Sequence, residues 1–239
     1  LDKLFNNGFS YLFRNFKTQD LTSKEVDRIG EFVNDINKEL KNLKLDFEIY
    51  MEHATFKDYS TDLEIPVLMK TNDFVLTIRL KKPDIILPLN QCGMGHTIII
   101  SILASIYFAK KKNIEKIQLQ NSKHKKEVLI VIREPETHLH PKLIEQLMEY
   151  LFNTTKNDKN IKIAIETHSE VILRQTQYLT KKLHENTKDK ENKKSNIIKV
   201  LYVDKKTKSR APYSTVSDLG IKNNGFLSKR VPDEFFDTN

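Results

Sequence analysis

The chain has 239 residues, of which 38% are hydrophobic and 30% are charged, proportions that exclude an intrinsically disordered protein. No apolar run is long enough to cross a membrane, and no signal peptide is visible. A single cysteine, Cys92, excludes an intrachain disulfide. We therefore expect a cytoplasmic globular protein without a membrane partner.

The chain is basic, with a formal net charge of +8. Such a charge favours encounters with nucleic acids and other polyanions, so DNA is one possible partner. A lysine-rich composition that serves only solubility would give the same net charge. Charge alone does not locate a binding groove, and both interpretations stay open.

The first part of the chain, residues 1–90, predicts a helix followed by a small antiparallel β layer. A capping box at residues 22–25 opens an amphipathic helix that reaches about residue 43. Residues 71–73 read as the turn of a hairpin, and Pro88 suggests an edge strand or a strand end. The segments with strand patterns are residues 47–51, 65–70, 74–80 and 85–89.

The second part, residues 91–239, begins with Gly93 and Gly95 ahead of an apolar helix at 97–109. Glycines at a helix N-terminus let backbone N–H groups approach an anion, although a plain loop before a buried helix would look the same. A lysine-rich connector is expected over residues 110–126.

Two apolar strands then end in polar side chains. Residues 128–132 precede Arg133 and Glu134, and residues 161–165 precede a second polar segment, 166–169. In open α/β sheets, ligands bind at the carboxyl ends of the strands, so these segments predict the floor of a nucleotide site.

Helical patterns follow both strands, and a further strand is expected at residues 197–203. Pro141 suits the first turn of one helix, and Ser169 can cap the other, which runs over residues 170–184. The expected fold is α/β, with a mixed sheet flanked by helices and the antiparallel layer upstream.

The stretch from Ile132 to Pro141 reads Ile-Arg-Glu-Pro-Glu-Thr-His-Leu-His-Pro. It resembles the Walker B and D-loop region of the ABC-type ATPases. The similarity is closest to the OLD-like group, which includes predicted ATPases of bacterial anti-phage operons and reads acid-acid-Pro-Glu-x-His-Leu-His-Pro. Residues 167–169 resemble its H-loop, and residues 93–95 resemble its signature segment. The tail at 225–237 is similar to a C-terminal element of one subgroup.

The resemblance implies an ATPase that sandwiches ATP at a head-to-tail dimer. Glu134 would orient the attacking water, and His168 would sense the γ-phosphate. The signature segment would contact nucleotide on the opposing subunit, and the D-loop would line the dimer interface. The implied nucleotide contacts are Gly93, Gly95 and Thr97, and the implied interface residues are Glu136, His138 and His140.

The sequence departs from this pattern in two places. Arg133 stands where an acid normally helps to hold Mg²⁺; an arginine cannot ligate that ion but can pair with a phosphate. Arg133 is therefore a candidate nucleotide contact, and Mg²⁺ is in doubt as a cofactor beside ATP.

No Walker A loop is present, because the glycines with the required spacing, Gly220 and Gly225, are followed by Phe226 and Leu227. We favour a separate, preceding lobe for this loop. Supply by another chain, or no ATP binding at all, are the alternatives.

Other interpretations of the same residues remain open. His138, His140 and His168, with Glu134 or Glu136, could bind a transition metal.

Glu166 is either a second active-site acid or a solvated strand end. Ser169 is better explained as a helix cap than as a nucleophile, because no Gly-x-Ser-x-Gly context surrounds it.

The sequence thus predicts the C-terminal part of an ABC-type ATPase. It would bind and hydrolyse ATP as a homodimer or larger homo-oligomer, and control a nuclease or another effector in anti-phage defence or DNA transactions. The alternative is a non-hydrolytic, nucleotide-gated scaffold or DNA-binding module that keeps the ATPase fold.

Overall fold

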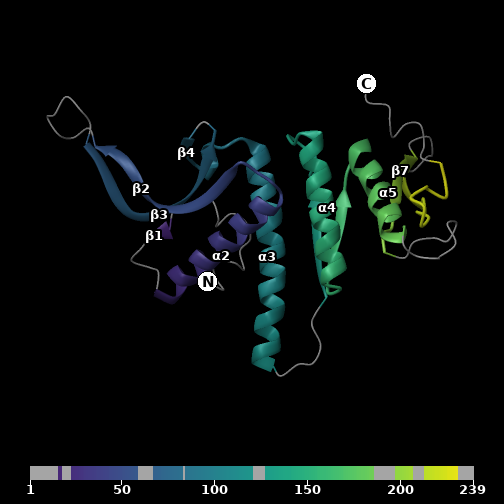
Figure 1. Ribbon diagram of the computed structural model, residues 1–239, viewed down its shortest axis with the longest axis horizontal. Helices are drawn as coiled ribbons and strands as arrows, with labels where there is room; N and C mark the ends of the chain where they lie inside the picture. The colour runs from purple at the N-terminus through teal and green to yellow at the C-terminus, as the bar shows by residue number, and fades with distance from the viewer. Residues whose placement is uncertain are drawn as a thin grey trace. The chain divides into compact units, whose positions relative to one another are not determined.

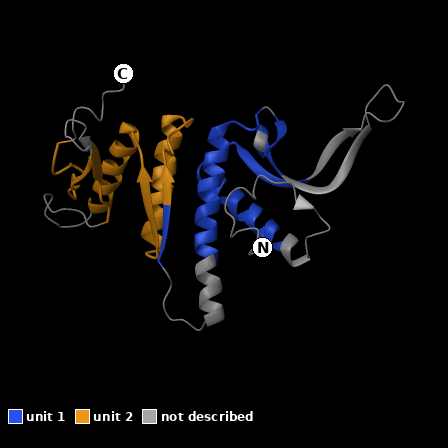
Figure 2. Cartoon of the chain, turned by 180° about the vertical axis from the view of Figure 1, so that it is seen from behind, with its two compact units in different colours: residues 1–130 blue, residues 131–239 orange. Residues whose placement is uncertain are grey.

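The computed structural model divides the chain into two compact units, Leu1–Ile130 and Val131–Asn239 (Figure 2). Each unit contains helices and strands, which confirms the expected α/β class. None of the helices that the structure describes has the length and apolar character needed to span a bilayer. The structure describes residues 16–17, 23–58, 67–82, 84–120, 127–185, 197–206 and 213–230.

The described residues of unit 1 form a four-stranded antiparallel sheet and two α-helices (Figure 1). The sheet order is β1-β3-β2, and β4 also pairs with β3, so the predicted antiparallel layer is confirmed. The elements are β1 (Phe16–Lys17), α2 (Ser23–Asn42), β2 (Phe47–Asp58), β3 (Val67–Lys81), β4 (Asp84–Pro88), the 3₁₀ turn η3 (Leu89–Gln91) and α3 (Met94–Gln120).

The hairpin turn predicted at residues 71–73 is wrong. These residues lie inside β3, which pairs with β2 on both sides of them and with β1 at Asp73. The β2–β3 register shifts here, since His53 pairs with Phe74 while Thr55 pairs with Lys70. Polar residues suit a bulge as well as a turn, and the long ladder with β2 decides between the two.

The core of unit 1 forms where α2 packs against β2 and α3. Phe32, Ile36 and Leu40 recur on one face of α2 and are buried, and Phe32 stacks on Phe108 of α3. Apolar burial of this kind is the main source of helix stability in a folded domain. It also explains why the N-terminal helix was predictable from its pattern alone.

Polar contacts fix the position of α2 on the sheet. The Asn37 side-chain amide donates to the carbonyl oxygen of Ile49 at 2.8 Å, and Asn37 Oδ1 accepts from the Ile49 N–H at 2.7 Å. Lys111 of α3 pairs with Glu31 of α2 at 3.0 Å. The amide therefore satisfies both backbone groups of one strand residue, which sets the register of helix on strand.

Helix α3 is longer than the sequence indicated. The connector expected over residues 110–126 is wrong for residues 110–120, which continue the helix. Lysines are good helix formers, so a lysine-rich stretch extends a helix as readily as it forms a loop. Residues 121–126 lie outside the described part of the chain.

Unit 2 contains a strand–helix–strand arrangement and a hairpin (Figure 1). Helix α4 contacts both β6 and α5, and strand β5 begins in the last residues of unit 1. The elements are β5 (Val128–Arg133), α4 (Pro141–Asn157), β6 (Ile161–Glu166), α5 (Glu170–His184), β7 (Leu201–Lys206) and β8 (Tyr213–Asp218).

The sheets of this unit differ in part from the prediction. Strands β5, β6 and helix α5 match the expected segments within one residue. However, β7 pairs antiparallel with β8, a strand that the sequence pattern missed, and the described part of the chain has no pairing of β7 with β5 or β6. The apolar residues of strand β8 alternate only weakly, so its sequence pattern did not indicate a strand.

The C-terminal segment packs tightly on α5 at Gly225. This glycine has a φ of 85°, and a Cβ placed there would lie 2.5 Å from the carbonyl oxygen of Gln177. A side chain is excluded by both conformation and space. The neighbouring Ile221 is fully buried, so the tail as far as residue 230 belongs to the packed unit. Residues 231–237 of the family-like tail lie outside the described part of the chain.

The predicted boundary at residue 90 is not the boundary between the compact units. The signature-like glycines, Gly93 just before helix α3 and Gly95 within it, belong to unit 1. The assignment of residues 91–239 to one functional segment stays a prediction.

Candidate active site

The turn that follows β5 is held in an unusual backbone conformation. Glu134 has a φ of 45° and His138 has a φ of 62°, and neither residue is a glycine. Left-handed backbone at such residues costs about 1–2 kcal/mol each and persists where surrounding contacts impose it. Thr137 N donates to the Glu134 carbonyl oxygen at 3.1 Å, and Leu139 N donates to that of Glu136 at 3.0 Å.

The carboxyl ends of β5 and β6 lie side by side. The Glu134 N–H donates to the carbonyl oxygen of Glu166 at 2.7 Å. Glu134 directly follows β5 and Glu166 ends β6, so the two strands run parallel and deliver their polar segments to one edge. This is the place where open α/β sheets hold their ligands.

Arg133 and Glu166 form a two-point ion pair at this edge. Arg133 Nε lies 2.8 Å from Glu166 Oε2, and Nη2 lies 3.4 Å from Oε1. The Glu166 carboxylate, by hydrogen bond and charge, raises the pKa of Arg133, with a smaller contribution from Glu134. The side chains are 74% and 53% exposed, so solvent screens the pair and limits its contribution to stability.

The ion pair bears on Mg²⁺ binding. Magnesium takes oxygen ligands, and the carboxylates at the strand ends belong to Glu134 and Glu166. One of these already neutralises the guanidinium of Arg133, whose positive charge opposes a second cation. The residues of this edge, taken by themselves, do not fit a Mg²⁺ ion.

Glu136 joins the turn after β5 to the turn after β6. Its Oε1 accepts from the Thr167 hydroxyl at 2.6 Å and from the His168 N–H at 3.0 Å. Thr167 Oγ1 in turn accepts from the Ser169 N–H at 2.9 Å. The sequence placed Glu136 at a subunit interface, and this intrachain contact was not predicted. No spacing rule relates residues 31 apart in sequence.

The histidines of the turn have separate roles. His140 occupies the N-cap of α4, where its Nδ1 accepts from the Lys142 N–H at 3.3 Å, and Pro141 follows at the first helical position. His138 is exposed. In the described part of the chain, no group of three or more His, Cys, Asp or Glu side chains is arranged to hold a metal ion. The geometry thus gives the transition-metal alternative no support.

Ser169 occupies the N-cap position of α5, as predicted, but its side chain makes no capping hydrogen bond. Its carbonyl oxygen accepts from the Leu173 N–H at 3.2 Å. The loop instead depends on Thr167 and Glu136 for its hydrogen bonds.

The signature-like residues belong to the other unit. Gly93 precedes α3, whereas Gly95 and Thr97 lie within its first turns, so the expectation that both glycines precede the helix is wrong for Gly95. A Cβ at Gly93 would meet nothing closer than His96 Nδ1 at 3.7 Å, so packing does not require a glycine there. The His96 ring packs edge-to-face on Phe47, with 4.8 Å between the ring centroids.

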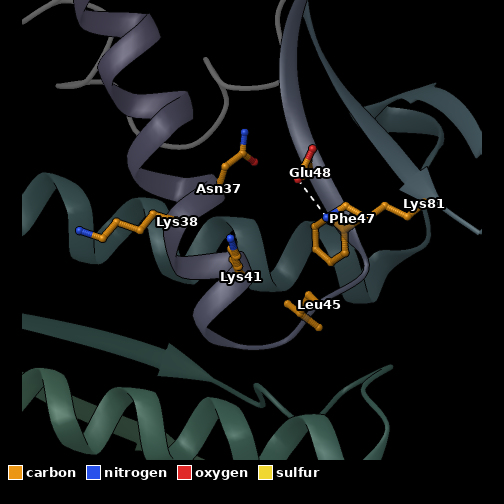
Figure 3. A pocket seen from close by; sticks show the side chains of 7 residues that line it. All are labelled: Asn37, Lys38, Lys41, Leu45, Phe47, Glu48 and Lys81. Atoms are coloured by element: carbon orange, nitrogen blue, oxygen red, sulfur yellow. Dashed lines mark ion pairs between the residues drawn. The ribbon is translucent and has the colours of Figure 1, made fainter.

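A cavity of about 280 Å³ lies elsewhere in unit 1, between α2 and the start of β2 (Figure 3). Two of its lining residues, Lys81 and Glu48, form an ion pair at 3.0 Å. It contains none of the predicted site residues. Its lining residues are Asn37, Lys38, Lys41, Leu45, Phe47, Glu48 and Lys81.

The family of the chain follows from a match that covers most of its length. The family described as AAA ATPase domain matches residues 1–173, which include both strand ends and the turns that follow them. The chain belongs to the AAA ATPase domain family. Proteins of this family are ATPases, and the strand-end residues are accordingly the candidate catalytic centre.

Individual relatives are more distant. Endonuclease GajA of Bacillus cereus (strain HuB5-5) is 23% identical over 186 residues, covering 72% of this chain and 26% of GajA. The chain thus spans about a quarter of that relative's length.

Two solved structures match most of the chain at a TM-score below 0.5. One comes from work on ATP-driven dimerization and DNA-stimulated activation of SMC ATPases, with a TM-score of 0.43 and 7% identity, covering 81% of this chain and 86% of that chain. The other is an SmcHead bound to the C-winged helix domain of ScpA, with a TM-score of 0.43 and 5% identity, covering 84% of this chain and 48% of that chain.

Proposed function

We propose that this chain is the C-terminal part of an ABC-type ATPase that binds and hydrolyses ATP at a head-to-tail dimer interface. The strand-end assembly carries the proposal. Glu134 is held at a φ of 45° beside the end of β6, and the neighbouring turn presents His168. Strained residues cluster at active sites, where the surrounding structure imposes a conformation that function needs.

Each strand-end residue has a distinct role in the proposed reaction. Glu134 accepts a hydrogen bond from the attacking water and aims it at the γ-phosphate, and His168 donates to a γ-phosphate oxygen. Arg133 contributes positive charge toward the phosphates, since a guanidinium matches phosphate geometry with two donors. Glu166 keeps Arg133 oriented before nucleotide binds.

The phosphate-binding loop is proposed to come from a segment outside these 239 residues, in the same longer protein or in a partner. The surface of β5 supports this. Leu129 and Val131 are each 63% exposed, while the alternate residues Ile130 and Ile132 are buried. Exposed apolar side chains in a strand of this kind are typical of a sheet face that another segment covers.

The signature segment at the start of α3 is proposed to act on nucleotide held by the opposing subunit, with Gly93, Gly95 and Thr97 as its contacts. The D-loop residues His138 and His140 would face the same interface.

A cytoplasmic location and control of a nuclease or other effector in anti-phage defence or DNA transactions follow from the OLD-like resemblance. Similarity to a protein named an endonuclease supports the effector.

Mg-ATP hydrolysis by the longest natural reading frame that contains this chain tests the proposal. We expect wild-type turnover and a Glu134→Gln variant that binds ATP but turns it over at least about 100-fold more slowly. Lys142→Gln, an exposed change near the same turn, is the matched control and should retain activity. The proposal fails if the wild type binds no nucleotide.

A non-hydrolytic, nucleotide-gated scaffold is the second candidate, and the Arg133–Glu166 ion pair favours it. This candidate predicts that ATP drives dimerisation of both the wild type and the Glu134→Gln variant, and that neither hydrolyses ATP. Replacing Arg133 by Asp, the usual family residue, would then increase Mg²⁺-dependent turnover. A DNA-binding module, in contrast, would show steep salt dependence on duplex DNA and no response to ATP.

A further inference from the structure

We propose that Glu136 is a positioning residue that sets the γ-phosphate sensor loop through a hydrogen-bonded bridge to Thr167 and His168. This inference rests on the proposed ATPase function for its kinetic consequence. The bridge itself is a property of the fold and can be tested without nucleotide.

The geometry of the bridge is specific. One oxygen, Glu136 Oε1, accepts from both the Thr167 hydroxyl and the His168 N–H, at 2.6 Å and 3.0 Å. The hydroxyl that donates to Glu136 accepts from the Ser169 N–H at the start of α5. Glu136 therefore holds two successive residues of the loop directly, and the third, Ser169, through the Thr167 hydroxyl.

The other carboxylate oxygen of Glu136 takes no part in the bridge, since both bridge hydrogen bonds go to Oε1. Glu136 Oε2 is buried and has no hydrogen-bond partner within the described part of the chain. Because it makes no hydrogen bond here, an uncharged amide of the same shape preserves every contact that the structure assigns to Glu136.

The bridge has a consequence for His168. Its backbone N–H is held while its side chain stays exposed, so the ring extends from a fixed point of the chain. Loss of the bridge frees the loop between β6 and α5. A displacement of about 1 Å at a catalytic group can cost on the order of 100-fold in rate.

The test compares Glu136→Ala, Glu136→Gln and Thr167→Val in the full natural protein, with Glu145→Ala on the exposed face of α4 as control. Amide hydrogen exchange at residues 167–169 is the first measurement. We expect Glu136→Ala to accelerate exchange at His168 by about tenfold or more, and Glu136→Gln to stay within about threefold of wild type. Thr167→Val should accelerate exchange at Ser169.

Steady-state kinetics is the second measurement. Glu136→Ala should lower kcat by about 10- to 100-fold with KM for ATP within about threefold, and Glu136→Gln should restore most of kcat. The proposal is overturned if Gln loses as much activity as Ala, or if His168 exchange is unchanged in Glu136→Ala. If the exchange results hold while the wild type does not hydrolyse ATP, the bridge stands and the proposed ATPase function fails.

Discussion

In each unit, one polar side chain makes two hydrogen bonds to a neighbouring segment. In unit 1 this side chain joins α2 to β2, and in unit 2 it joins the two strand-end turns. In unit 1, Asn37 satisfies both backbone groups of Ile49. In unit 2, Glu136 satisfies two donors of a loop, but exposed charges and residues with positive φ surround it.

The two regions also differ in what packs around that polar contact. Ile36 and Leu40 flank Asn37 on α2 and are almost completely buried. At the strand ends, Arg133, Glu134 and His168 are exposed. The first region is arranged for stability, whereas the second keeps backbone strain at Glu134 and His138.

The largest expected effect is on the core of unit 1. Ile36 is 1% exposed, so Ile36→Ala should lower the free energy of unfolding by about 3 kcal/mol through lost burial and a residual cavity. Urea denaturation of the purified protein measures this. Asn34→Ala, an exposed change on the same helix, should shift stability by less than about 0.5 kcal/mol. Equal effects for the two variants would contradict the assigned packing of α2.

Relief of backbone strain is the next largest effect and separates stability from chemistry. Glu134→Gly should raise the free energy of unfolding by about 1 kcal/mol, because glycine accepts a φ of 45° without strain, and it should abolish ATP turnover. His138→Gly relieves a φ of 62° and should stabilise similarly while keeping the Glu134 carboxylate. Thermal unfolding and ATPase assays on both variants provide the comparison. Destabilisation by Glu134→Gly would show that its conformation carries no strain.

Two glycine substitutions in unit 1 compare a candidate ligand contact with an ordinary helix position. Gly30 is exposed on α2 with no atom within 4 Å of an added Cβ, so Gly30→Ala should stabilise by about 1 kcal/mol and leave function unchanged. Gly93→Ala also has room, and its stability should change by less than about 0.5 kcal/mol. If the signature segment contacts nucleotide, Gly93→Ala alone weakens ATP-driven dimerisation, measured by light scattering. Unchanged dimerisation would remove Gly93 from the site.

The smallest effect concerns acid stability at the edge of the sheet in unit 1. A hydrogen bond from Tyr50, followed by the contact with Lys81, lowers the pKa of Glu48 below its usual 4.5. A carboxylate with a lowered pKa in the folded state stabilises above pH 4.5, and that contribution is lost as the pH falls through the folded pKa. Both side chains are partly exposed to solvent, which screens the pair, so Glu48→Gln should cost only about 0.5 kcal/mol at pH 7. Denaturation at pH 7 and pH 3 should show the difference shrinking at the lower pH.

Much of the fold could be predicted because it depends on local pattern. The apolar periodicity of α2 and the uninterrupted apolar runs of β5 and β6 predicted these elements. Prediction failed at residues 71–73 and 110–120. A polar tripeptide suits a bulge or a turn, and the pairing of β3 with β2 decided between them. A lysine-rich segment suits a helix or a loop, and the local pattern alone does not choose between the two.

The candidate site divides in the same way. The motif from Ile132 to Pro141 selected Glu134 as a candidate site residue, and the segment 167–169 selected His168, because strand ends and residue types are local properties. The pairing of Arg133 with Glu166 and the bridge from Glu136 to Thr167 were not predictable. They join side chains about 30 residues apart, and parallel strands bring such residues together only when an intervening helix returns the chain to the same edge. The sequence by itself determined which groups the two strand ends carry. Only the tertiary structure decided which of those groups meet, because hydrogen bonds and ion pairs depend on distances between neighbouring strands.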